Sequence, residues 1–153
     1  MRIPDSISSM VYQMRHPWVW TLMVWAVAGA ALPLMLEVSG AWWMELTAFV
    51  CCGLGFAVGC VPLVCGEENR AHYVLAVGVG VLSQAWVVMA TWDFRVGAPR
   101  FLMLATVLFV WANYVFFLPL WGRRWCLVAE LLCMGTVACS VAWLTVLWLI
   151  IKS

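Results

Sequence analysis

Charged side chains are scarce in this chain. Only 10% of its 153 residues are Asp, Glu, Lys or Arg, and 67% are hydrophobic. A soluble domain has about 25% charged and about 45–50% apolar residues, so this composition excludes one. The net charge of +1 comes without any cluster of Lys and Arg. We therefore expect no nucleic-acid partner.

Signatures of cross-links, metal sites and catalysis are also missing. The seven cysteines are odd in number and include no C-x-x-C pair, and histidine occurs only twice. This pattern argues against a disulfide framework and against a zinc site. The chain also lacks a nucleophile elbow, an H-E-x-x-H motif and a P-loop. We therefore expect no metal, no cofactor and no catalytic residue, and we interpret the cysteines as small apolar residues.

What the chain does contain is five long apolar runs. Each is near the ~20 residues that an α-helix needs to cross a hydrocarbon core of ~30 Å. The runs do not alternate between polar and apolar residues, as the strands of a membrane barrel would. The sequence predicts a single domain, 1–153. Its fold class is all-α, a polytopic integral membrane bundle of five transmembrane helices with spans at about 18–36, 46–65, 73–92, 101–121 and 125–150.

The segment 1–16, ahead of the first run, has its own pattern. Its apolar residues recur at spacings of three and four, which predicts a short amphipathic helix on the membrane surface. Pro17 suits the first turn of the next helix because its missing N–H would be unpaired there anyway. The apolar run then continues through Leu36, which favours a retained first helix over a cleaved signal peptide.

The positive charges give an orientation. The side that would hold the N-terminus carries five of them and the other side three, and Lys and Arg favour the cytoplasmic side. We expect a bacterial cytoplasmic membrane, with the N-terminus cytoplasmic and the C-terminus external. The five are Arg2, Arg15, Arg70, Arg123 and Arg124, and the three are Arg95, Arg100 and Lys152.

Small residues recur every four positions in two of the runs. The second run has Cys51, Gly55 and Gly59, and the third has Ala76 and Gly80. In lipid, helices associate by close packing, and small residues let backbones approach. We expect these faces to pack the second and third helices together, and an oligomer interface is the alternative.

Tryptophan falls into two groups. Eight of the twelve lie near the expected membrane interfaces, which an amphipathic indole favours. The other four lie deeper, where we expect them to pack between helices and to need acceptors for their N–H groups. These four are Trp25, Trp86, Trp111 and Trp143.

Polar residues inside the last three runs form a candidate intramembrane seam. Glu130 is the one clearly ionisable residue within a run, and such residues are often functional. In one interpretation the seam is hydrogen-bonding glue between helices. In the other it lines a path for a proton or a small substrate. The seam residues are Ser83, Gln84, Asn113, Tyr114, Glu130 and Ser140.

Two loops expected on the same side carry opposite charges. Glu67 and Glu68 precede the third helix, and Arg123 and Arg124 follow the fourth. Each pair suits the dipole of its helix end. We predict that these four residues pair and hold the two hairpins together.

Three functions remain open at this level. The first is a non-enzymatic accessory or assembly subunit whose partners are the lipid bilayer and a second copy or another membrane protein. The second is a small transporter or ligand-binding protein built around Glu130. The third is a lipid-modifying enzyme that uses the polar loop from Glu67 to His72.

Overall fold

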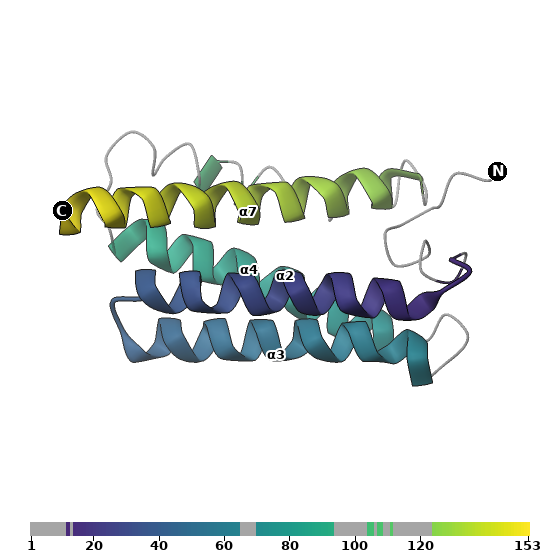
Figure 1. Cartoon of the computed structure of the whole chain (residues 1–153). Coiled ribbons are helices and arrows are strands. Elements are labelled where there is room, and N and C mark those ends of the chain that lie inside the picture. Colours follow the sequence, from purple (N-terminus) through teal and green to yellow (C-terminus); the bar gives the residue numbers. More distant parts are fainter. Residues whose placement is uncertain are drawn as a thin grey trace.

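The described part of the chain is all helical. In a computed structural model, the residues described are Tyr12, 14–64, 70–93, five positions between 104 and 111, and 124–153. They form four long helices, coloured from purple to yellow in Figure 1, and no strand. The helices are α2 (Pro17–Val38), α3 (Trp42–Val64), α4 (Arg70–Asp93) and α7 (Arg124–Lys152).

Each of these helices has the length and composition of a membrane span. They contain 22, 23, 24 and 29 residues. At ~1.5 Å per residue each is longer than a ~30 Å hydrocarbon core. Four stretches within them are apolar enough to cross a membrane. The prediction of an all-α chain with membrane-length helices is confirmed for the described residues, and it implies a lipid environment.

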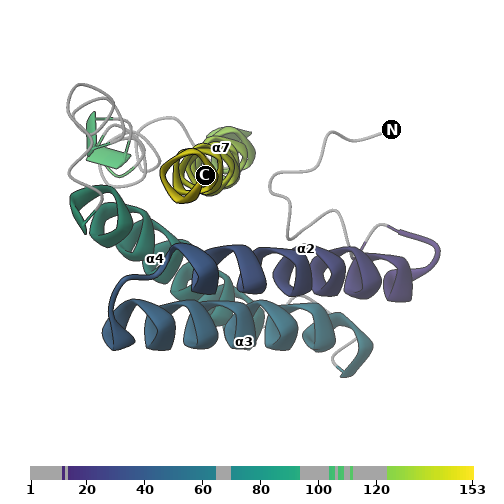
Figure 2. The same cartoon turned by 60° about the vertical axis from the view of Figure 1, so that its left-hand side comes forward.

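Interhelical contacts fix the direction of the helices. Thr21 and Trp25 of α2 meet Gly59 and Phe56 of α3 in reverse order, so these two helices are antiparallel. Figures 1 and 2 show α2 and α3 side by side, with α4 crossing behind them and α7 on the side of α2 away from α3. We call the end where α2, α4 and α7 begin the proximal end, and the end where they finish the distal end.

The core lies where α2, α3, α4 and α7 converge toward the distal end. Trp86 of α4 is fully buried, and its Nε1 donates to the Ser39 hydroxyl at 3.2 Å. Ser39 in turn ends α2 by donating its hydroxyl to the carbonyl of Met35 at 2.7 Å. Leu144 of α7 is also fully buried in this cluster. One polar turn therefore anchors the largest buried side chain of the bundle.

The predicted boundaries differ most at the second span. The sequence predicts a start at about Leu46. The helix instead begins at Trp42, with Glu45 in its first turn. A carboxylate is stabilised there by the positive end of the helix dipole. The other three spans differ from the prediction by one to three residues at either end.

The structure does not show two of the predicted elements as helices over their predicted lengths, namely the surface helix at 1–16 and the span at 101–121. Of the surface helix at 1–16, the structure describes Tyr12 and Met14–His16, and none of these is helical. Most of the predicted span 101–121 lies outside the described residues. The positions described within it are helical, and one of them, Val107, is 6% exposed and belongs to the core cluster.

Candidate functional site

Gln84 is the most buried member of the predicted seam. It lies in α4 and is 2% exposed. Its Nε2 lies 3.3 Å from the carbonyl oxygen of Cys133 and 3.2 Å from the Cys133 thiol, and it donates to both. Its Oε1 is also buried and has no hydrogen-bond partner among the residues that the structure describes. A buried amide acceptor left unpaired is destabilising, so this oxygen would favour a hydrogen-bond donor placed beside it.

The surroundings of Cys133 bring three helices together. Gly80 of α4 lies one turn before Gln84, and a Cβ at this glycine would be 4.0 Å from the Cys133 sulfur. Glu130 comes three residues before Cys133 in α7, and the Cys51 thiol of α3 donates to the carbonyl of Val79, the residue next to Gly80. A carboxylate, an amide and two thiols therefore share one region between α3, α4 and α7.

The remaining seam residues do not all lie near Gln84 and Cys133. Ser83 and Ser140 are buried, but the Ser83 hydroxyl donates to the carbonyl of Gly80 within its own helix, at 3.0 Å. Glu130 is half-buried. Asn113 and Tyr114 lie outside the described residues. The structure thus brings Gln84 and Glu130 to the same neighbourhood through Cys133.

The small residues of the second span face two different helices. Cys51 lies toward α4, and its thiol donates to the carbonyl of Val79 at 3.7 Å. Gly55 and Gly59 lie against α2 instead, because a Cβ at Gly55 would be 3.4 Å from Ala28, and one at Gly59 would be 3.0 Å from the Trp25 ring. The closest approach that these two glycines make is to the first helix, whereas we expected it to be to the third.

The small residues of the third span also do not face α3 together. Gly80 approaches Cys133 of α7. Ala76 is half-buried. In this helix it is Gly78 that meets α3, since a Cβ there would be 3.1 Å from Leu54. Small residues spaced four apart indicate a face where helices can pack closely. The spacing does not indicate which of the neighbouring helices packs there.

The predicted loop pairing is not tested by the described residues. Glu67, Glu68 and Arg123 lie outside them, and of Arg124 only the backbone is described. The ends of α3 and α7 that border these loops, Val64 and Arg124, both lie at the proximal end (Figure 1). The pairing stays a prediction.

The described ion pair is at the opposite end of the bundle. Lys152 Nζ lies 3.3 Å from Glu37 Oε1, and both side chains are more than half exposed. The same ammonium lies 4.0 Å from the centre of the Trp148 ring. Exposed pairs of this kind are worth about 0–1 kcal/mol. The pair therefore shows that the end of α7 lies beside the end of α2, and it adds little to the stability of the bundle.

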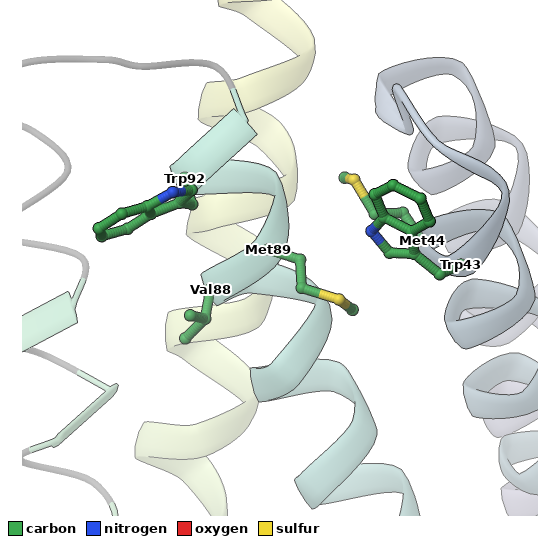
Figure 3. Close-up of a pocket in the computed structure, with 5 residues that line it drawn as sticks. All are labelled: Trp43, Met44, Val88, Met89 and Trp92. Atoms are coloured by element: carbon green, nitrogen blue, oxygen red, sulfur yellow. The ribbon is translucent and has the colours of Figure 1, made fainter.

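An apolar hollow lies at the distal end between α3 and α4. It encloses about 240 Å³ and is partly open. Figure 3 shows the Met89 side chain reaching from α4 toward Trp43 and Met44 on α3. We call this site the distal hollow, and its lining residues are Trp43, Met44, Val88, Met89 and Trp92.

Sequence reasoning missed the distal hollow. The sequence does place Trp43 beside Met44 at the start of the second run. It also places Met89 three residues before Trp92 at the end of the third run. We interpreted those tryptophans as membrane-interface anchors only. Trp43 and Trp92 do remain 52% and 61% exposed, so they border the hollow and the membrane at once.

Neither a metal centre nor a known relative adds to this description. Among the residues that the structure describes, no group of three or more His, Cys, Asp or Glu is arranged to hold a metal ion. Comparison with protein families, curated proteins and solved structures finds no match to this chain. The class that fold and composition define is a helical, multi-pass membrane protein.

Proposed function

We propose that this protein is a non-enzymatic accessory or assembly subunit, and that the distal hollow receives a side chain from a helix of its partner. The observation that carries the proposal is the lining of the hollow, which is entirely Trp, Met and Val. Aromatic residues and Met are enriched where proteins contact each other. Methionine also adapts its shape to an incoming surface. A hollow flanked by two half-exposed indoles offers such a surface within the membrane.

Site-specific photo-crosslinking tests this proposal. A photoreactive amino acid replaces Met89 in the hollow, and in a control chain it replaces Leu149. Leu149 lies near the distal end of α7 and is 56% exposed. We expect Met89 to give a discrete protein adduct in native membranes, and Leu149 to give lipid adducts alone. The adduct mass tells a second copy from a different protein. The same adducts at both positions would refute the proposal.

We also propose that the chain crosses the membrane five times. Lys152 meets Glu37, and Trp86 meets Ser39, so α4 and α7 both run from the proximal to the distal end. Two spans that point the same way need an odd number of crossings between them. The 30 residues 94–123 are enough for one crossing of ~20 residues. The predicted span 101–121 supplies it.

The positive charges support an N-terminus in the cytoplasm. Arg15 and Arg70 lie at the proximal end, where α2 and α4 begin. Lys152 is at the distal end, beside Glu37. Lys and Arg concentrate on the cytoplasmic side of membrane proteins. The proximal end is therefore proposed as cytoplasmic, and the distal hollow as lying near the external face.

A second candidate function is supported by the unpaired acceptor of Gln84. A small transporter or ligand-binding protein would use Gln84 and Glu130 as hydrogen-bonding groups for a polar guest. Glu130→Gln removes the charge but keeps the shape, and Glu45→Gln does the same at an exposed position. Both variants are compared for rescue of a gene-deletion phenotype. Loss of rescue by Glu130→Gln alone supports this candidate, and rescue by both variants contradicts it.

A further inference from the structure

Gln84 is a polar side chain held deep inside the bundle. It lies about 21 Å along α4 from Arg70, well within a ~30 Å hydrocarbon core. Its side chain is 2% exposed, and its Nε2 donates to both the carbonyl oxygen and the thiol of Cys133 in α7. These two contacts determine which way the amide faces.

The orientation of this amide leaves its oxygen as an unpaired acceptor. If the amide were reversed, Oε1 would face the carbonyl oxygen of Cys133, and two acceptors repel each other. In the observed orientation Oε1 is buried and has no hydrogen-bond partner within the described part of the chain. Buried amide oxygens are nearly always bonded to protein or to ordered water, because an unpaired one is destabilising. Gln84 Oε1 therefore favours a small hydrogen-bond donor.

Space for such a donor lies beside Gly80, one turn before Gln84 on α4. Of the described neighbours, the nearest to a Cβ built on Gly80 would be the Cys133 sulfur, at 4.0 Å. An added methyl group would fit there at an ordinary contact distance, and a water molecule is of similar size. A buried water needs roughly two to four polar partners. The Gln84 amide and the Cys133 thiol are two such groups, and their Nε2 and Sγ atoms already lie 3.2 Å apart.

We propose that Gln84, Cys133 and Gly80 form a binding site for a water molecule inside the membrane. The water donates to Gln84 Oε1 and accepts a hydrogen bond from the Cys133 thiol, and the missing side chain of Gly80 leaves room for it. A thiol is a weak donor, so the amide oxygen is the main anchor. The site shares Gln84 with the ligand-binding candidate above, but it holds equally for an accessory subunit, because a single water needs no transported guest.

Radiolytic footprinting tests the site, because hydroxyl radicals form from water where it lies and oxidise nearby thiols. The full chain in lipid nanodiscs receives a brief X-ray pulse, and mass spectrometry follows Cys133 and Cys139 separately. Cys139 lies on the same helix and is exposed, whereas Cys133 is half-buried. We expect Cys133 to be oxidised faster than Cys139. Exposure alone predicts the reverse order.

Two matched glycine variants locate the water. Gly80→Ala puts a methyl group in the space beside Cys133 and leaves the hydrogen bonds of Gln84 in place. Oxidation of Cys133 should then fall to the level of Cys139. Gly135→Ala adds the same methyl group to α7 where no described neighbour lies within 4 Å, and it should leave Cys133 oxidation unchanged. If Gly80→Ala does not fold, Gln84→Leu removes the acceptor and should lower Cys133 oxidation in the same way.

Two results would overturn the proposal. One is oxidation of Cys133 that is no faster than that of Cys139 in the wild type. The other is an equal rate of Cys133 oxidation in Gly135→Ala and in Gly80→Ala, or in the Gln84→Leu variant that replaces it. Neither readout involves the crosslink at Met89 or the rescue by Glu130→Gln, so a failure here is distinct from a failure of either proposed function.

Discussion

At the residue scale, two glycines of α3, Gly59 and Gly53, differ in how much space surrounds them. A Cβ at Gly59 would be 3.0 Å from two atoms of the Trp25 ring and 3.5 Å from the carbonyl oxygen of Thr21. Moving the ring away would break the hydrogen bond that its Nε1 donates to the carbonyl of Phe56 at 3.1 Å. Around Gly53 there is nothing within 4 Å. The two sites lie in the same helix and differ only in their neighbours.

We predict that Gly59→Ala destabilises the protein and Gly53→Ala does not. Crowding Trp25 should lower the free energy of unfolding by about 1–3 kcal/mol. Gly53→Ala should leave it unchanged or raise it by up to about 1 kcal/mol, because alanine favours the helix. Unfolding in micelles with a rising fraction of SDS, followed by circular dichroism, measures both. Equal effects of the two substitutions would contradict the α2–α3 contact described above.

The candidate site was only partly predictable at this scale. The sequence indicated that Gln84, inside a membrane helix, needs a polar partner. It did not identify the partner, because a backbone carbonyl and a thiol at Cys133 carry no polar signature in the sequence. Trp86 and Trp25 do find acceptors, as expected. The expectation that Trp143 packs between helices is wrong, because that side chain is 45% exposed.

At the scale of elements, α2 and α3 are joined by side chains that bind backbone carbonyls. Thr21 Oγ1 donates to the carbonyl of Gly59 at 2.7 Å, and Trp25 Nε1 donates to that of Phe56. Pro62 follows inside the same helix and has no N–H to offer to the turn before it. The two donors from α2 therefore reinforce α3 beside the turn that its proline weakens.

We predict that Thr21→Val weakens the α2–α3 pair by about 0.5–2 kcal/mol, the range for hydrogen bonds between membrane helices. Thr136→Val is the matched control, because the Thr136 hydroxyl donates to Leu132 of its own helix. Its effect should stay below about 0.5 kcal/mol. The same SDS unfolding measurement compares them. A loss as large for Thr136→Val as for Thr21→Val would show that the interhelical bond has no special weight.

Elements were predicted better than their contacts. Apolar runs of about 20 residues determine where helices form, because every backbone group in lipid needs an internal partner. Which helices touch depends on the rotation of each about its own axis. Gly55 and Gly59 illustrate the difference, since their spacing predicted a close contact but not that α2 would make it.

At the scale of the whole molecule, the direction of α7 determines the topology. Its last residue pairs with Glu37 at the end of α2. Its buried Leu144 packs in the same core cluster as Trp86 of α4. Both contacts place the end of α7 with the ends of α2 and α4. This shared direction of α4 and α7 supports the proposed crossing between them.

Reporter fusions test this central claim most directly. Green fluorescent protein, which fluoresces in the cytoplasm, and alkaline phosphatase, which is active outside, are each fused after Ser153. As a reference they are inserted at Gly40, in the turn between α2 and α3. The account predicts that Ser153 and Gly40 both report the external side, and that an N-terminal fusion reports the cytoplasm. A C-terminus on the same side as the N-terminus would contradict it.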